Sequence, residues 1–405
     1  MMPTSSLDKA ANAGGSSPPF VPGKNCRVLV FAHVPPPLHG QSQMVQWLVE
    51  GLGRRRDLRV EVLHVDARLS TDLTDVGAAR GGKLGLLFGY VRQALRLRFS
   101  EGVKIFYYVP SPPKRNSLYR DWMVLLAIRL FFRRTIFHWH AVGLGAWLEE
   151  KARPWERWVS WWLLGRSSLS IILAETNRSD AEKFKPRACI SVANGIPDPC
   201  PDYARSLAEV RLRQGLARRV GQVVVPVLYL AHCTRDKGLF DAVSAVLEAN
   251  RLGSGTLRFV LTVAGTFVTA DEERDFKALL ASTECQGVVR YIGFVSGDSK
   301  TEAFRSHELF LFPTYFANEG QPVNLIEAMA WGLPVVTTRW RAIPEFFDSG
   351  YKGLVEPRDS PAAGAALLAV AQSVDAAALR ARFESAYSID RHLEAMAAAF
   401  HSVAV

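Results

Sequence analysis

Two glutamates eight positions apart, Glu319 and Glu327, lie between two apolar segments, residues 309–313 and 334–338. The apolar segments predict strands, so the acidic residues belong to a loop and a short helix of one β-α-β unit. Glu327 has aliphatic neighbours, and burying its carboxylate among them is costly unless a partner shares its hydrogen bonds. Glu319 would lie just beyond the carboxyl end of a strand, where open α/β sheets bind ligands.

The residues between the two glutamates could hold an anion. Pro322 suits the first turn of a helix, because its missing N–H would have no partner there in any case. The N–H groups of Val323 and Asn324 are then free to face a negatively charged group. Two carboxylates for sugar hydroxyls and a helix N-terminus for phosphate together predict a nucleotide-sugar site.

A second motif, residues 231–238, follows another apolar segment and leads into a predicted helix. It contains Arg235 and Lys237, and cations at a helix N-terminus oppose its dipole unless an anion lies between them. Arg235 could also bind phosphate oxygens through its forked guanidinium. The alternative for both residues is solvated surface charge.

The spacing of Glu319 and Glu327, followed by Ala-Met-Ala-x-Gly-x-Pro-Val-Val, resembles the donor-site signature of retaining glycosyltransferases of family 4 (glycosyl transferases group 1). The resemblance implies that Glu319 contacts the hydroxyls of the donor sugar, that Glu327 contacts those of the ribose, and that Lys237 binds the pyrophosphate. The family's Gly-Arg pair is replaced by Ala231-His232, so Arg235 is expected to supply the second cation.

Another departure from the family pattern concerns the loop before Val323. The family usually has Phe-Gly where this chain has Gln321-Pro322. Since Pro322 removes a backbone donor, the departure bears on how many amides reach the phosphates.

The first half of the chain supplies further candidates. Gly40 ends a loop that resembles the family's N-terminal glycine loop, and it would let the backbone approach the donor phosphate or the acceptor. His138 and His140 share one face of a predicted strand. The family has a histidine at this strand end that meets the donor sugar, and His140 is the closer match, whereas His138 fits a core histidine. His140 and Glu319 are therefore the expected catalytic residues, with Glu319 positioning the sugar rather than acting as a nucleophile.

The resemblance implies a retaining hexosyltransferase that moves a sugar from a nucleotide-sugar to an acceptor hydroxyl on a glycan or a lipid-linked glycan, in bacterial polysaccharide or glycolipid biosynthesis. The chain has no Asp-x-Asp, so we expect neither a cofactor nor an obligatory metal. Two alternatives stay open. One is another enzyme on the same fold, a nucleotide-sugar 2-epimerase or a glycan phosphorylase. The other is a non-catalytic protein that binds anions or nucleic acid, although no nucleic-acid-binding motif is evident and we expect no such partner.

Strands that alternate with helices predict an α/β fold, with parallel doubly wound sheets. The pattern restarts after a polar segment, which predicts two Rossmann-like domains facing across a cleft, as in the GT-B fold of the family. We expect a disordered tail over residues 1–24, an acceptor domain over 25–200 and a donor domain over 201–385. Residues 386–405 are expected to form a helix that packs back on the first domain.

Charge is unevenly distributed along the 405 residues, whose net charge is +10. Residues 25–200 carry 26 lysines and arginines against 15 acidic residues, and eight of the ten tryptophans precede residue 201. This half is therefore expected to meet an anionic partner. Residues 84–99 and 155–164 either lie on an anionic membrane surface or pack against the core. Scattered cysteines and the lack of an apolar leader predict a cytoplasmic protein, with peripheral attachment to the inner face of the cell membrane as the option that these helices leave open.

Overall fold

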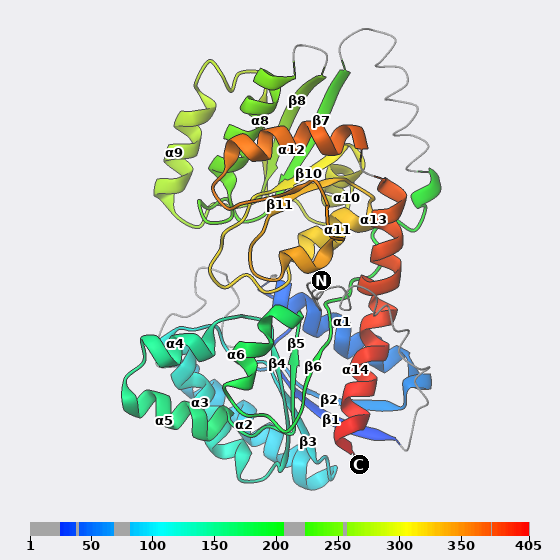
Figure 1. Cartoon of the computed structure of the whole chain (residues 1–405). Coiled ribbons are helices and arrows are strands. Elements are labelled where there is room, and N and C mark those ends of the chain that lie inside the picture. Colours follow the sequence, from blue (N-terminus) through cyan, green and yellow to red (C-terminus); the bar gives the residue numbers. More distant parts are fainter. Residues whose placement is uncertain are drawn as a thin grey trace, which may run out of the picture.

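The computed structural model describes residues 25–37, 40–68, 82–205, 223–253, 257–373 and 375–404. The predicted tail and the start of the glycine loop, Leu38-His39, lie outside the described residues. Within the described residues the chain builds two six-stranded sheets, each with parallel strands and helices on both faces (Figure 1). The α/β prediction of two doubly wound domains is confirmed.

The first sheet has the strand order β2-β1-β3-β4-β5-β6. Its strands are short apolar runs with almost no polar alternation, as expected where both faces of a parallel sheet are covered. They are β1 (Cys26–Phe31), β2 (Val60–Val65), β3 (Ile105–Tyr108), β4 (Arg134–Trp139), β5 (Leu169–Ile172) and β6 (Cys189–Ser191).

Alternate side chains of these strands enter two separate cores. Phe106 and Tyr108 of β3 pack under one set of helices, and Ile105 and Tyr107 pack under the other. The first set is α2 (Gly82–Ser100), α3 (Arg115–Arg129), α4 (Leu144–Glu150), α5 (Pro154–Leu164) and α6 (Arg178–Glu182), and the second is α1 (Gly40–Arg54) and α14 (Ile389–Ala404). Short 3-10 turns are η1 (Arg56–Leu58) and η3 (Glu175–Asn177).

The second sheet has the order β12-β11-β10-β7-β8-β9. Its strands are β7 (Val223–Leu230), β8 (Leu257–Ala264), β9 (Val289–Gly293), β10 (Leu309–Phe312), β11 (Val335–Thr338) and β12 (Leu354–Val355). The helices are α8 (Leu239–Leu252), α9 (Ala270–Leu280), α10 (Gly297–Arg305), α11 (Val323–Ala330), α12 (Ser360–Ser373) and α13 (Ala376–Arg382), with the turn η4 (Ile343–Phe346) and the π-helix η5 (Phe383–Tyr387).

The strand order of the second sheet reverses between β7 and β10, because the chain runs outward from β7 through β8 and β9 before it returns to β10 on the other side. Loops that leave two such strands diverge and open a crevice at their carboxyl ends. The loop after β7 carries Lys237, and the loop after β10 carries Glu319. Topology alone therefore brings these two residues to one place.

The end of the chain runs from the second domain to the first, as α13 and α14 show in red (Figure 1). Backbone hydrogen bonds join Ile196 to Tyr387 and Ile389, and the guanidinium of Arg380 binds Asp198. α14 then buries Phe400 in the core with β1 and α1. These contacts tie the two domains together beside the linker.

His392 of α14 makes the fold sensitive to acid. Its Nδ1 lies 2.7 Å from the carbonyl oxygen of Ala193, and burial lowers the pKa of His392 to about 4. A histidine that stays neutral in the fold and protonates in the unfolded chain costs stability as pH falls below about 6.5. Between about pH 7 and pH 5 this residue is expected to remove about 2 kcal/mol from the free energy of unfolding. Denaturant titrations at both pH values should show that loss in the wild type and a smaller one in His392→Gln, and an equal loss in both would contradict the assignment.

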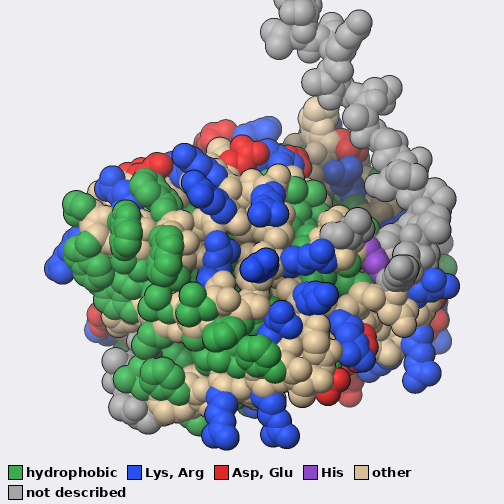
Figure 2. Space-filling view, turned by 90° about the horizontal axis from the view of Figure 1, so that it is seen from below, with side chains coloured by type: hydrophobic (Ala, Val, Ile, Leu, Met, Phe, Trp, Pro, Cys, Tyr) green, Lys and Arg blue, Asp and Glu red, His purple; other side chains and the backbone are tan. Residues whose placement is uncertain are grey.

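One side of the first domain exposes many apolar side chains, although no single described helix has the length and apolar composition to cross a bilayer. Among the described residues only a bent pair, α12 with the segment from α13 to Tyr387, meets that test, by length and composition alone. Figure 2 looks at the first domain from below and shows apolar side chains gathered over part of this surface, with lysines and arginines among and beside them.

Candidate functional site

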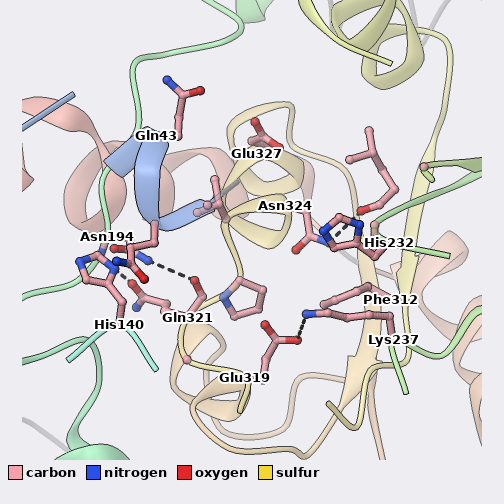
Figure 3. A pocket seen from close by; sticks show the side chains of 18 of the residues that line it. Gln43, His140, Asn194, His232, Lys237, Phe312, Glu319, Gln321, Asn324 and Glu327 are labelled. Atoms are coloured by element: carbon pink, nitrogen blue, oxygen red, sulfur yellow. Dashed lines mark hydrogen bonds and ion pairs between the residues drawn. The ribbon is translucent and has the colours of Figure 1, made fainter. Parts of the chain in front are cut away.

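A cavity of about 550 Å³ lies where the two domains face each other. Loops at the strand ends of both domains line it, and Figure 3 shows their side chains converging on it. The first domain contributes Gly40, Gln43, Trp47, Pro112, His140 and Asn194, and the second contributes His232, Lys237, Thr266, Lys300, Glu319, Val323, Asn324 and Glu327, among others. All the predicted site residues except Arg235 therefore line one cavity.

Lys237 and Glu319 meet directly in this cavity (Figure 3). The Lys237 Nζ donates to Glu319 Oε2 at 2.7 Å, and the Thr314 hydroxyl donates to the same oxygen at 3.1 Å. The ammonium also lies 4.4 Å from the centre of the Phe316 ring. Both charged side chains are largely buried, at 17% and 8% exposure, so each depends on the other for neutralisation.

Gly238 explains why the loop after β7 can lie so close to β10. It has a φ of +79°, and a Cβ there would stand 2.2 Å from the carbonyl oxygen of Pro313. Only glycine fits both the left-handed conformation and the close approach. The next residue toward the N-terminus is Lys237, so this contact sets the position of the ammonium.

Glu327 lies on α11, and it too has a lysine partner. The Lys300 Nζ donates to Glu327 Oε1 at 2.6 Å. Lys300 comes from α10, and sequence reasoning missed it. The helix α10 was not predicted, and once it is known, the argument that singled out Lys237 applies, because Lys300 lies in its first half and opposes its dipole.

The N-terminus of α11 faces the cavity without a side-chain cap, and Pro322 is its N-cap residue. The side chain of Asn324 fixes this end to the first strand of the domain, because its Nδ2 donates to the carbonyl oxygen of Leu230 at 2.9 Å. Its Oδ1 is buried and has no hydrogen-bond partner among the described residues. The backbone N–H groups of Val323 and Asn324 thus start a helix that is held in place and open to an anion.

His232 is a second residue that sequence reasoning did not assign to the site, beyond noting that it replaces the family's arginine. It lines the cavity near Lys237 (Figure 3). The side chain is exposed to the cavity, and partial desolvation, followed by the Lys237 ammonium, lowers the pKa of His232 below its usual value. The imidazole is therefore neutral at physiological pH and can exchange hydrogen bonds with a ligand without adding charge.

The loop between the two glutamates also touches the first domain. The backbone N–H of Asn194 donates to Gln321 Oε1 at 2.6 Å, and Asn194 Nδ2 donates to the backbone oxygen of Gln321 at 3.1 Å. A Cβ on Gly320 would lie 2.4 Å from the carbonyl oxygen of His140. Gln321, which departs from the family pattern, therefore forms part of a direct contact that holds the two walls of the cavity together.

His140 and His138 have different surroundings although they share one strand face. His140 lines the cavity, and its ring centre lies 4.2 Å from that of His138. His138 is buried, with its Nδ1 2.7 Å from the Tyr107 hydroxyl. Burial, followed by the proximity of His140 and His392, holds the pKa of His138 well below its usual range. His138 is thus a neutral core residue behind the histidine that reaches the cavity.

Arg235 is the one predicted site residue that the structure does not bring to the cavity. Its guanidinium donates to Asp275 Oδ2 at 2.6 Å and lies 4.2 Å from the centre of the Phe240 ring. These partners turn it toward α9 and solvent. The structure therefore does not place Arg235 where the hypothesis of a second cation requires it, and the ammonium that lines the cavity besides Lys237 is that of Lys300. No three His, Cys, Asp or Glu side chains in the described part of the chain gather as metal ligands would.

Comparisons with known proteins give matches over part of the chain. Residues 226–373 match the family model of glycosyl transferases group 1. The amylovoran biosynthesis glycosyltransferase AmsK of Erwinia amylovora is 31% identical over 151 residues, which cover 36% of this chain and 36% of that protein. A glycogen synthase of Mycobacterium tuberculosis is 28% identical over 233 residues, 55% of this chain and 50% of its own. The chain thus spans between a third and a half of the length of these curated relatives.

Solved structures extend the likeness to the whole fold. The crystal structure of HepE from Anabaena in complex with UDP superposes with a TM-score of 0.65 at 15% identity, over 93% of this chain and 100% of that one. Sucrose-phosphate synthase from Thermosynechococcus elongatus gives a TM-score of 0.65 at 15% identity, over 93% of this chain and 99% of that one. Residues 226–373 therefore match glycosyl transferases group 1, and the described chain as a whole has the two-domain GT-B fold.

Proposed function

We propose that this protein is a retaining glycosyltransferase that transfers a sugar from a nucleotide-sugar to an acceptor hydroxyl in bacterial polysaccharide or glycolipid biosynthesis. One observation carries the proposal: two lysine–carboxylate pairs and an uncapped helix N-terminus face the same interdomain cavity. A nucleotide-sugar has the matching groups in one molecule, because it joins two polyhydroxylated rings through a diphosphate. AmsK is a glycosyltransferase of amylovoran biosynthesis and HepE was solved in complex with UDP, and both facts support the same class.

In this proposal the second domain holds the donor. Lys237 and the first amides of α11 face the pyrophosphate, Glu327 accepts hydrogen bonds from the ribose hydroxyls, and Glu319 accepts them from the transferred sugar. Positive charge in a cavity shielded from water stabilises the negative charge that grows on the leaving diphosphate as the glycosidic bond breaks. These groups, rather than a metal, are assigned that role.

The first domain completes the reaction site from the opposite wall. His140 lines the cavity beside Gln321 (Figure 3), and we assign it to the reacting sugar. The contact of Gly320 and Gln321 with His140 and Asn194 closes the domains and excludes water. Release of that contact would let donor and product exchange, so domain opening is expected to gate turnover.

Donor binding provides the direct test. We expect UDP-, GDP- and ADP-sugars, added in turn, to raise the melting temperature unequally, because a ligand at about 100 times its Kd stabilises the native state by about 2.7 kcal/mol. An increase in melting temperature that occurs with one nucleotide base and saturates with ligand concentration would support the site. No increase with any of the three nucleotide-sugars would refute it.

The class of reaction needs a separate assay with the donor that binds. Transfer with retention is expected to give a product whose new linkage has the same anomeric configuration as the donor, which proton NMR reads directly. Conversion of the donor without any acceptor would instead indicate an epimerase. Release of a sugar phosphate from a glycan in phosphate buffer would indicate a phosphorylase.

A further inference from the structure

Three neighbouring helices of the first domain, α2, α3 and α5, present an apolar face to solvent. Of the large hydrophobic side chains that are exposed among the described residues, most belong to these helices or to the two residues just after α3. Leu130 is 75% exposed, Trp158 68%, Phe99 66%, Phe88 64% and Trp162 56%. A soluble monomer seldom exposes so many large apolar groups together without a partner.

Ring contacts join the helices into one continuous surface, which we call the aromatic face. Phe99 at the end of α2 meets Phe131 beyond α3, with ring centres 5.6 Å apart. Beneath this surface the buried Trp122 of α3 supports the exposed Trp155 of α5, with ring centres 5.5 Å apart. Trp158 and Trp162 then stack along α5 at 6.3 Å. Figure 2 shows such apolar side chains gathered at this end of the molecule.

The charge of the aromatic face has one sign. The three helices contain only two acidic residues, Asp121 and Glu156, and both carboxylates are fully buried. Asp121 accepts hydrogen bonds from Tyr108 and Ser111, and Glu156 accepts them from Arg115 and from the backbone of Arg153. Neither contributes negative charge to the surface.

Two cations of α2 lie at the surface of the aromatic face. Arg92 and Arg96 are exposed and form no ion pair with any described residue. They follow Phe88 at intervals of four residues and precede Phe99, so all four side chains share one stripe of the helix. Arginines therefore stand between the exposed rings and not on an opposite face.

We propose that the aromatic face binds the surface of an anionic lipid bilayer. Tryptophans favour the interface between headgroups and acyl chains, where their apolar body is buried and their N–H stays near water. Exposed arginines attract anionic headgroups. A second copy of this chain fits the face less well, because a twofold contact would set its arginines against each other. The proposal stands on this surface alone and does not depend on the proposed function.

The face is connected to the cavity through α3. Pro112 lines the cavity and lies three residues before α3 begins at Arg115. If the proposed function holds, a bilayer bound to the aromatic face would present a lipid-linked acceptor to the first domain, the side of the cavity that contains His140.

Vesicle flotation of the full chain tests the aromatic part of the proposal. The protein is expected to float with vesicles of phosphatidylcholine mixed with phosphatidylglycerol, and much less with phosphatidylcholine alone. Replacing Trp158 and Trp162 together with glutamate should weaken the partition coefficient roughly tenfold or more per tryptophan. The matched control is Val268→Glu, an apolar side chain of the second domain that is 65% exposed, and it should bind like the wild type.

The arginines are tested separately. Arg92→Ala and Arg96→Ala should each weaken binding to the anionic vesicles about fivefold, and added salt should reduce the difference. Arg274→Ala, which removes a 69% exposed arginine from α9 of the second domain, is the control and should leave binding unchanged.

Three results would overturn the proposal. They are no flotation with anionic vesicles, equal flotation of the wild type and the glutamate variant, and a dimer in sedimentation equilibrium that the glutamate substitutions dissociate. An unchanged donor-induced melting shift in the variants would show that they remain folded. If the variants no longer float but keep the donor-induced melting shift, the result concerns the aromatic face alone. If the wild type floats with vesicles but shows no donor-induced melting shift, the result contradicts the proposed function alone.

Discussion

Lys237→Met is expected to raise the KM for the sugar donor at least roughly thirtyfold, since removing one buried charged contact to a ligand costs about 2–5 kcal/mol. In the wild type the ammonium lies 2.7 Å from Glu319 Oε2 and faces the cavity. Methionine keeps much of the length of the side chain but leaves the pyrophosphate without its nearest cation. Initial rates over a range of donor concentrations measure the change.

The same substitution also leaves the Glu319 carboxylate buried without its ionic partner, which destabilises the fold independently of any ligand. The double variant Lys237→Met/Glu319→Gln separates the two effects. It should recover much of the melting temperature lost by Lys237→Met, because the remaining amide carries no charge, but it should not recover donor binding. A double variant that regains the wild-type KM would show that Lys237 only neutralises Glu319.

The control for Lys237→Met is a lysine of the same domain that lies away from the cavity. Lys277 on α9 pairs with Glu273 at 2.6 Å and is well exposed. Lys277→Met should therefore change neither the KM nor the melting temperature appreciably, since exposed pairs on a helix contribute about 0.3–0.5 kcal/mol. If Lys277→Met raised the KM as much as Lys237→Met, the loss of any positive charge in this domain would explain the effect.

The fold and the centre of the site could be predicted because they follow from local patterns. Alternating apolar strands and helices specify parallel sheets, and the strand ends at the switch point collect the loops of Lys237 and Glu319. Glu327 belongs to the same short motif as Glu319, so their common cavity required no knowledge of distant contacts.

Contacts between remote parts of the chain could not be predicted in the same way. Lys300 reaches Glu327 from 27 residues away, and Arg235 is drawn to Asp275 from 40 residues away. Side chains of both arginine and lysine are long enough to choose among several carboxylates, and tertiary packing decides which is near. The contact of Asn194 with Gln321 spans 127 residues and depends on how the domains close.

The helical periodicity of α5 likewise left two interpretations open. A stripe of tryptophans fits either a core or an interface, because spacing shows which residues share a side and not what covers that side. In the structure Leu163 and Leu164 are buried, whereas Trp158 and Trp162 are exposed. The leucines therefore provide the packing of α5 against the core, and the tryptophans remain on the surface.

Glu327→Gln is expected to weaken binding of the nucleotide-sugar about 10- to 100-fold, because hydrogen bonds to a charged group contribute about 1.5–3 kcal/mol. The carboxylate is 11% exposed and lines the cavity on α11. Glutamine keeps the shape and one acceptor oxygen, so packing of α11 should be preserved. Isothermal titration with the donor measures the loss.

A donor analogue identifies which hydroxyls the carboxylate meets. If Glu327 accepts hydrogen bonds from the ribose, a 2′,3′-dideoxy donor should bind the wild type weakly and should lose almost nothing further in Glu327→Gln. Independent losses that add in full would place the carboxylate elsewhere in the cavity. The control Glu302→Gln changes an exposed glutamate of α10 and should leave both affinities unchanged. The cycle thus tests the ribose contact itself, since it compares the two ligands on each of the two proteins and cancels any effect of the substitution that both ligands share.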